Sequence, residues 1–139
     1  MHQQLSLNPN RVFVSYSSKD RVFALRLKRD LEQDGIDVWF DDNELEIGRS
    51  LTESLAAGVI SSGWLIVVIS RNSVESAWVI REIELGLRTE RERSSPFVLP
   101  IVIESCSMPA ILGDRIGANF TESYDKGYAH LLRVLVPDL

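Results

Sequence analysis

The sequence predicts an α/β domain built on a parallel sheet. Two patterns point to it: five short apolar segments recur along the chain, and amphipathic segments at helical spacing separate them. A third is that residues 64–70 (WLIVVIS) are almost all apolar, which is typical of a strand covered by helices on both faces. Right-handed crossovers then give a flavodoxin-like three-layer fold, for which we expect the strand order 2-1-3-4-5.

The first strand, helix and second strand follow from local patterns. Residues 11–16 (RVFVSY) and 36–40 (IDVWF) are rich in β-branched and aromatic side chains, as strands are. Between them, Asp20 is a suitable N-cap for a helix with a regular apolar stripe. Gly35 can take the left-handed conformation that ends this helix. These segments therefore predict a β-α-β unit.

A long acidic loop and two helices flank the central strand. Residues 41–50 (DDNELEIGRS) are too many and too polar for a tight turn. Ser50 and Glu53 match a capping box, in which the two residues satisfy each other's backbone N–H groups, and a helix to about residue 60 should follow. After the central strand, residues 73–88 carry apolar side chains at helical spacing and predict the next helix.

The last third of the chain completes the sheet. Residues 96–103 (PFVLPIVI) predict a fourth strand, and Pro100 places this strand at an edge or distorts it. Residues 107–113 can form one or two helical turns. Residues 116–120 predict a short fifth strand, and residues 124–136 predict a final amphipathic helix.

The composition indicates one globular domain. With 139 residues, a mass of 15.7 kDa and 45% hydrophobic residues, the chain can bury a real core. We expect a polar lead-in over residues 1–10 and one domain over residues 11–136. The formal net charge is −5, with 20 acidic and 15 basic residues, which provides no basic field for nucleic acid or an anionic membrane. We therefore expect neither partner.

Cysteine, histidine and hydropathy patterns bear on location and metal binding. Cys106 is the only cysteine, so no intrachain disulfide can form. His2 and His130 are far apart, and no metal-ligand spacing occurs, so we expect no metal. The first residues lack the pattern of a secretory signal, and the longest apolar run, residues 64–69, is too short to span a bilayer. A cytoplasmic location is the resulting expectation.

The predicted sheet brings several polar segments to one crevice. In open parallel sheets, ligands bind outside the carboxyl ends of the strands where the strand order reverses, here between strands one and three. That position gathers residues 16–18, 41–50 and 70–82. Trp78 and Glu82 lie one helical turn apart, close enough to contact one ligand. The alternative is that Trp78 belongs to the core and Glu82 is a solvated helix charge.

Several common nucleotide and hydrolase sites are absent from the sequence. There is no G-x-G-x-x-G after a strand and no P-loop, which disfavours a Rossmann dehydrogenase or a kinase. A two-component receiver domain would carry acidic residues where this chain has Tyr16, Ser17 and Ser70. No G-x-S-x-G elbow with a histidine partner occurs either. What remains is one carboxylate with aromatic and small polar groups.

Three segments resemble motifs of the Toll/interleukin-1 receptor (TIR) domain. Residues 12–17 (VFVSYS), followed by Asp20, resemble the opening strand of that family. Residues 38–48 (VWFDDNELEIG) resemble its second strand and the loop through which TIR domains associate. Residues 73–82, ending in WVIRE, resemble the S…W-x-x-x-E pattern of members that degrade NAD. The resemblance covers residues 11–135 and implies a bacterial origin and a role in signalling, defence or virulence.

The resemblance also implies roles for individual residues. Glu82 would be the catalytic carboxylate, and the residues that would contact the substrate are Tyr16, Ser17, Trp39, Ser73 and Trp78. The loop residues that would contact a neighbouring copy in a homotypic, head-to-tail assembly are Asp42, Leu45, Ile47 and Gly48. Ile47 stands where the family often has proline. From the residues alone, each tryptophan could instead be core and each serine a cap.

The expected function is that of an NAD⁺ nucleosidase activated by self-association. Departure of neutral nicotinamide leaves positive charge on the ribose, and a carboxylate that holds the ribose hydroxyls stabilises this oxocarbenium-like state. The products would be nicotinamide and ADP-ribose, or a cyclic ADP-ribose isomer. NAD⁺ would be the substrate, with no cofactor. The alternatives are a non-catalytic TIR adaptor module and, more distantly, a flavodoxin-type nucleotide-binding domain.

Overall fold

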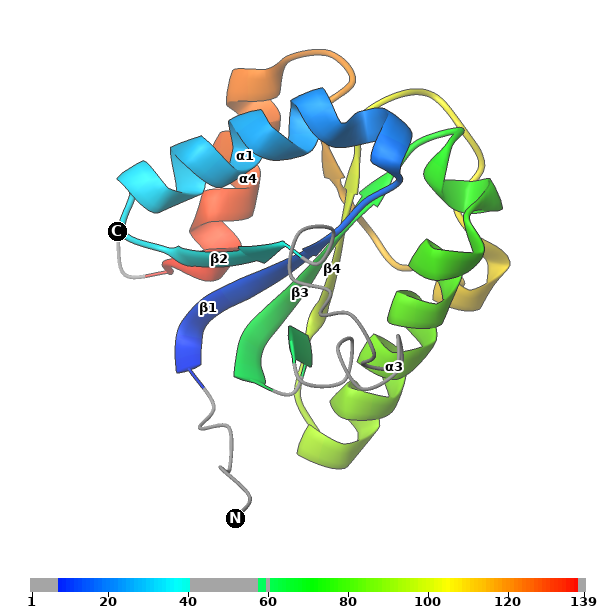
Figure 1. The fold of residues 1–139 in the computed structure, drawn as a ribbon, viewed down its shortest axis with the longest axis horizontal. Coiled ribbons are helices and arrows are strands. Elements are labelled where there is room, and N and C mark those ends of the chain that lie inside the picture. The colour runs from blue at the N-terminus through cyan, green and yellow to red at the C-terminus, as the bar shows by residue number, and fades with distance from the viewer. Residues whose placement is uncertain (1–7, 41–57, 60, 138–139) are drawn as a thin grey trace, which may run out of the picture.

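The chain forms three layers around a parallel sheet (Figure 1). The computed structural model describes residues 8–40, 58–59 and 61–137. Within these ranges the sheet has five strands in the order β2-β1-β3-β4-β5, and each neighbouring pair is parallel. The predicted α/β class and strand order are confirmed.

Strands and helices alternate along the described residues. The strands are β1 (Asn8–Ser15), β2 (Asp37–Phe40), β3 (Ser62–Ile69), β4 (Val98–Val102) and β5 (Ala118–Asn119). The helices are α1 (Arg21–Gln33), α3 (Ala77–Arg93) and α4 (Tyr124–Leu135). Short 3₁₀ turns are η1 (Ser18–Asp20), η2 (Ser73–Glu75) and η3 (Ala110–Leu112).

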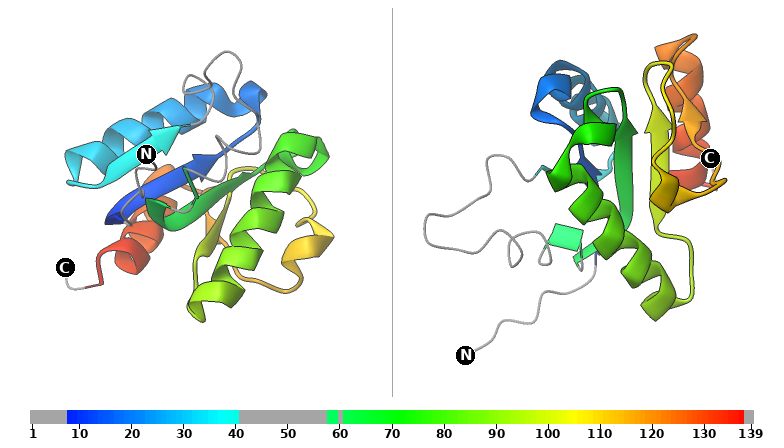
Figure 2. Two further views of the ribbon diagram at one scale, coloured as in Figure 1. Left: turned by 60° about the horizontal axis from the view of Figure 1, so that its bottom comes forward. Right: turned by 90° about the vertical axis from the view of Figure 1, so that its right-hand side faces the viewer.

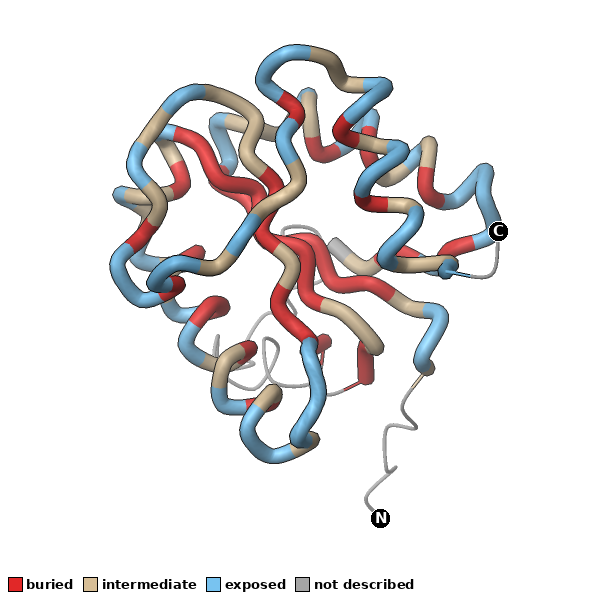
Figure 3. The backbone as a smooth tube through the Cα atoms, turned by 180° about the vertical axis from the view of Figure 1, so that it is seen from behind, coloured by how far each residue is buried: buried red, intermediate tan, exposed pale blue. Residues whose placement is uncertain are grey.

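The two faces of the sheet are covered by different helices (Figure 2). Successive residues of a strand point to opposite faces of the sheet. Val12, Val14 and Tyr16 therefore pack in one core cluster with α1 and α4. Phe13 packs in a second cluster with the buried side of α3. The central strands are buried between helices whose outer sides are exposed (Figure 3).

Most predicted boundaries agree with the structure to within a few residues. Gly35 has a positive φ of 84° and follows the end of α1, as predicted. β1 begins at Asn8 instead of residue 11, so this strand is longer than expected. β5 is shorter than expected and has only two residues. The predicted loop over residues 41–50 and the capping box at Ser50 lie outside the described residues.

The helix that carries Glu82 begins later than predicted. Residues 73–75 form the turn η2, and α3 starts at Ala77. Ser76 is the N-cap, because its hydroxyl accepts a hydrogen bond from the Val79 N–H at 3.3 Å. This bond satisfies one of the amides that a helix start leaves without an intrahelical partner.

Pro100 lies inside the sheet, which corrects the expectation of an edge strand or a distortion. β4 lies between β3 and β5, and its pairing with β3 is regular, with Pro100 opposite Val67. The carbonyl of Phe97 and the N–H of Ile103 both bond to β3, so by alternation Pro100 faces β5. β5 pairs only from Ile101 onward. The missing proline N–H therefore costs no hydrogen bond to β5.

Glu90 holds the second half of α3 to the sheet. Its Oε2 accepts hydrogen bonds from the N–H groups of Phe97 and Val98 at 2.9 and 2.8 Å. Both of its oxygens accept from the Arg115 guanidinium, at 2.6 and 2.8 Å. Burial opposes ionisation, but the hydrogen bonds from Arg115, Val98 and Phe97 outweigh it, and the pKa of Glu90 is lowered from its ordinary value of 4.5. Glu90 thus joins α3 to the start of β4.

Glu90→Gln is expected to lower the free energy of unfolding by about 1–3 kcal/mol near neutral pH, because Arg115 loses its charged partner. Since the pKa of Glu90 is lowered on folding, its contribution is present above pH 4.5 and is lost as the pH falls through the lowered value. Urea unfolding of parent and variant from acidic to neutral pH measures this, and the two stabilities should converge at the acidic end. The control is Glu92→Gln at an exposed neighbouring position. Equal stabilities at neutral pH would contradict the prediction.

Gly86→Ala tests how closely α3 lies on the sheet. An added Cβ would lie 2.5 Å from Leu65 Cδ2 and 2.8 Å from Val98 Cγ2. Alanine gains about 1 kcal/mol of helix propensity over glycine, but overpacking typically costs about 1–3 kcal/mol. We expect a net loss of stability in urea unfolding, whereas Arg88→Ala on the exposed side of α3 should change little. A stabilised Gly86→Ala variant would show that α3 has room to move outward.

Candidate functional site

The candidate site lies where the carboxyl ends of β1 and β3 meet α3. β1 and β3 are neighbours, and the order of the strands reverses between them. Ser15, the last residue of β1, donates a hydrogen bond from its hydroxyl to Oε1 of Glu82. Both side chains are completely buried. The structure therefore joins a carboxylate to the end of a central strand, at the place where open α/β sheets bind ligands.

The apolar stripe of α3 explains why Glu82 faces the sheet. Val79 and Ile83 lie four residues apart on the buried side of the helix, and Glu82 directly precedes Ile83. One turn later, Gly86 allows the helix to approach Leu65 closely. Glu82 is therefore not the solvated helix charge of the alternative interpretation. A buried carboxylate costs several kcal/mol unless it is hydrogen-bonded, which makes the bond from Ser15 important for this arrangement.

Trp78 lies one helical turn before Glu82 and is half-buried. Its side chain packs against the core cluster of the α3 face, which also contains Val79 and Ile83. The sequence left core packing and substrate contact open as alternatives for Trp78. The position agrees with both, because part of the indole packs in the core and part is exposed. Residues at this spacing share one side of the helix, so Trp78 and Glu82 are brought together.

Tyr16 and Ser17 follow β1, and the structure places Tyr16 on the opposite face of the sheet from Glu82. Tyr16 is buried, with 4% of its surface exposed, and packs in the core cluster on the α1 and α4 face. Glu82 and Ser15 lie on the α3 face, so the sheet separates Tyr16 from them. The Ser17 hydroxyl accepts a hydrogen bond from the Lys19 N–H at 3.4 Å and caps η1. Here the structure gives Ser17 the capping role that the sequence left open.

Ser73 is buried in a turn that leads from β3 into α3. Its hydroxyl accepts a hydrogen bond from the Ser70 N–H at 2.8 Å, and its own N–H donates to the Ser70 hydroxyl at 3.0 Å. Ser73 therefore acts as a structural residue of this turn. It is the first residue of η2 and lies outside α3, whose N-cap is Ser76.

Asp20 has a role that the sequence analysis missed. It occupies the N-cap position of α1, as predicted, but its side chain makes no capping hydrogen bond there. Instead, its carboxylate accepts hydrogen bonds from the Ser70 hydroxyl and from Asn72 Nδ2, the latter at 3.1 Å. The sequence contained a sign of this contact. Asp20 and Ser70 follow strands one and three, which the predicted strand order places side by side.

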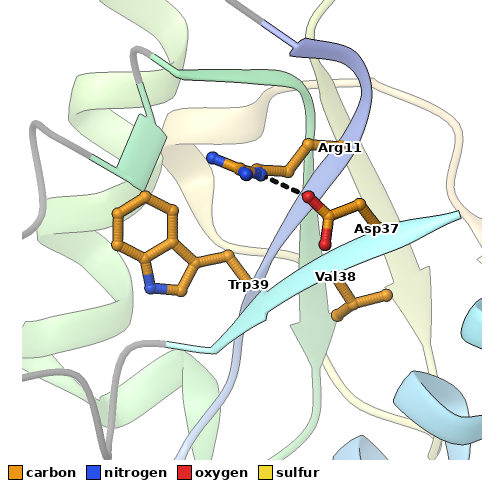
Figure 4. Close-up of a pocket in the computed structure, with 4 residues that line it drawn as sticks. All are labelled: Arg11, Asp37, Val38 and Trp39. Atoms are coloured by element: carbon orange, nitrogen blue, oxygen red, sulfur yellow. Dashed lines mark hydrogen bonds and ion pairs between the residues drawn. The ribbon is translucent and has the colours of Figure 1, made fainter. Parts of the chain in front are cut away.

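Trp39 lines a shallow pocket of about 270 Å³ with Arg11, Asp37 and Val38 (Figure 4). The Arg11 guanidinium carbon lies 5.6 Å from the centre of the Trp39 ring, and Arg11 Nε bonds to Asp37 Oδ2 at 2.7 Å. Trp39 is paired with Phe13 across β1 and β2, and their ring centres are 6.2 Å apart. Trp39 therefore lies on the same face as Glu82 but packs toward Arg11.

The remaining predicted site residues are outside the structure's described ranges. These are the assembly-loop residues Asp42, Leu45, Ile47 and Gly48. In the part of the chain that is described, no three His, Cys, Asp or Glu side chains gather as a metal site would require. No helix in those ranges is long and apolar enough to cross a membrane. The site as described is one buried carboxylate with the Ser15 hydroxyl and a half-buried indole.

Comparison with known sequences identifies relatives of this chain. The profile of the TIR domain family matches residues 12–132. The chain is 30% identical over 130 residues to the NAD(+) hydrolase TcpA of Theionarchaea archaeon (strain DG-70-1), a match that covers 89% of this chain and 39% of that protein. It is 31% identical over 91 residues to the 2' cyclic ADP-D-ribose synthase AbTIR of Acinetobacter baumannii (strain 1295743), which covers 65% of this chain and 34% of that protein. The chain therefore spans less than half the length of these curated relatives.

Solved structures share the fold. The TIR domain of the Toll-related receptor TRR-2 from Hydra magnipapillata matches with a TM-score of 0.77 at 20% sequence identity, over 89% of this chain and 96% of that chain. At this identity the likeness concerns the fold alone. Together with the profile match over most of its length, it shows that this chain belongs to the TIR domain family.

Proposed function

We propose that this domain cleaves the bond between nicotinamide and ribose in NAD⁺, with Glu82 as the catalytic carboxylate. The observation that carries the proposal is the burial of Glu82 at the switch point of the sheet, bonded to Ser15. Evolutionarily related proteins named NAD(+) hydrolase and 2' cyclic ADP-D-ribose synthase support this choice of substrate. A helix charge with no function would more commonly lie in solvent.

One carboxylate is chemically sufficient for this reaction. Nicotinamide leaves NAD⁺ as a neutral molecule, so its departure needs little acid catalysis. The ribose left behind carries positive charge, which the negative charge of Glu82 stabilises in a site that excludes water. The Ser15 hydroxyl would keep the carboxylate in one orientation while it holds the ribose hydroxyls. The half-exposed Trp78 on the same helix would stack on a planar part of the substrate.

Substrate access requires a change at the site. The Glu82 side chain has no exposed surface, so ribose reaches it only after neighbouring side chains move. Head-to-tail contact with a second copy through residues 42–48 would supply the energy for this change. Activity would then rise steeply with the local density of the domain, and NAD⁺ and other TIR domains would be its partners.

The product follows from what attacks the ribose. Water gives ADP-ribose, whereas a nucleophile within the substrate gives a cyclic isomer. The two relatives, the NAD(+) hydrolase TcpA and the 2' cyclic ADP-D-ribose synthase AbTIR, are named for one outcome each. We propose hydrolysis as the main reaction and a cyclic product as its competitor, and chromatography of the products distinguishes them.

Glu82→Gln is expected to reduce NAD⁺ cleavage by at least about 100-fold, because the variant keeps the shape of the side chain and loses its charge. Release of nicotinamide is measured by chromatography over a wide range of protein concentration, with and without tethering to beads. Glu84→Gln, at an exposed position two residues further along α3, is the control and should keep parental activity. An inactive parent with an intact fold would instead favour a non-catalytic interaction module. Equal activity of parent and Glu82→Gln would exclude Glu82 as the catalytic group.

Ser15→Ala is expected to lower both stability and activity. Removing a hydrogen bond to a buried charged group costs about 1–3 kcal/mol, and a carboxylate that is free to turn slows the chemical step by about 10-fold or more. Urea unfolding and NAD⁺ cleavage at saturating substrate measure the two effects. Ser18→Ala, at an exposed position after the same strand, should alter neither. Unchanged activity of Ser15→Ala would show that Ser15 does not orient Glu82.

A further inference from the structure

Asp20 links two loops at the carboxyl edge of the sheet. It lies in the connection from β1 to α1, and both of its oxygens accept hydrogen bonds from the connection between β3 and α3. Oδ2 accepts from the Ser70 hydroxyl, and Oδ1 accepts from Asn72 Nδ2 at 3.1 Å. Asp20 and Ser70 are 50 residues apart in the sequence, so this link exists only in the folded chain.

The segment held by Asp20 also has hydrogen bonds of its own. Ser70 and Ser73 exchange hydrogen bonds between their backbone and side-chain atoms, at 2.8 Å from Ser70 N–H and 3.0 Å from Ser73 N–H. Both residues are completely buried. The Ser70 hydroxyl accepts from Ser73 and donates to Asp20, so the carboxylate completes this small network. Because Ser70 and Ser73 are bonded to each other, the bond that fixes Ser70 at Asp20 also fixes the start of the turn η2.

The same connection is bonded on its other side to the segment that follows β4. Glu104 Oε1 accepts a hydrogen bond from the Arg71 N–H at 2.6 Å, and Arg71 Nε donates to the Ser105 carbonyl at 3.3 Å. Arg71 is exposed, whereas Ser70 and Ser73 are buried. Of the two attachments, the one through Asp20 is therefore less open to competition from water.

The position of this turn sets the position of Glu82. α3 begins at Ala77, directly after the N-cap Ser76, and Glu82 lies about 7–8 Å further along the helix axis. A helix transmits a displacement of its first turn to its second because its backbone hydrogen bonds keep it stiff. Catalytic groups work only within about 0.5 Å of their productive geometry. A small shift at Ser70 is therefore enough to move Glu82 out of place.

We propose that Asp20 is a positioning residue for Glu82. Through Ser70 and Asn72 it fixes the start of α3, and so holds the Glu82 carboxylate at the end of β1. Asp20 acts through the turn and not on the substrate, so it governs the rate of the chemical step more than substrate binding. As an effect on NAD⁺ cleavage, this role rests on the proposed function, but the placement of α3 can be measured without substrate.

Asp20→Asn tests this role in the full chain. The variant keeps the size of the side chain but removes the charge and one acceptor. We expect kcat for NAD⁺ cleavage to fall about 10-fold or more while KM changes by less than about 3-fold. Asn72→Ala removes only one of the two donors and should have a smaller effect of the same kind. Asp125→Asn, an exposed carboxylate on α4, is the matched control and should match the parent.

A double variant separates positioning from a general loss of stability. If Asp20 acts through Ser70, Asp20→Asn combined with Ser70→Ala should lower kcat no further than the worse single variant. Independent, additive losses would overturn the proposal. So would an unchanged kcat in a folded Asp20→Asn variant. If Asp20→Asn does not fold, the same comparison is made with Asn72→Ala, and an unchanged kcat there also overturns it.

Amide hydrogen exchange without substrate keeps the proposal separate from the proposed function. In Asp20→Asn, exchange should quicken in peptides covering residues 70–82 and stay at the parental rate in α4. If the parent does not cleave NAD⁺ but exchange quickens in this pattern, the function fails and the positioning role stands. Exchange that is unchanged over residues 70–82 overturns the positioning role, whether or not the parent is active.

Discussion

A buried carboxylate at the junction of β1 and α3 is the interaction on which the site depends. Glu82 has no exposed surface and is bonded to the Ser15 hydroxyl. Placing a carboxylate there is unfavourable unless the surrounding groups satisfy it, so the end of β1 and the second turn of α3 must remain in register. A hydrophobic residue at position 82 would pack more simply. A carboxylate held there at a cost to stability is typical of a site kept for chemistry.

Polar contacts attach α3 to the rest of the domain at several places along its length. Asp20 fixes the turn before its first residue through Ser70, Ser15 holds its second turn through Glu82, and Glu90 joins its second half to the start of β4. Between these attachments, apolar side chains seal the helix on the sheet. The polar contacts thus specify where α3 lies, while the apolar contacts supply most of the energy that keeps it there.

The fold alone does not specify the activity. A TIR domain from a Hydra receptor shares the architecture at 20% identity, and that likeness says nothing about chemistry. The buried environment of Glu82 and the relatives named for reactions of this kind are what support the proposed NAD⁺ cleavage. The chain spans less than half the length of those relatives.

The sequence by itself determined the class, the order of the strands and the candidate carboxylate. The class follows from local properties: apolar runs mark strands, helical periodicity marks helices, and Gly35 ends α1 because glycine tolerates a positive φ. The strand order followed from the flavodoxin-like fold that alternating strands and helices favour. The same patterns left open whether Glu82 is solvated. They also grouped Tyr16 with the site, although the alternation of β1 sends its side chain to the opposite face. Only the tertiary structure gave Glu82 its partner Ser15, 67 residues away, because that contact depends on how α3 docks on the sheet.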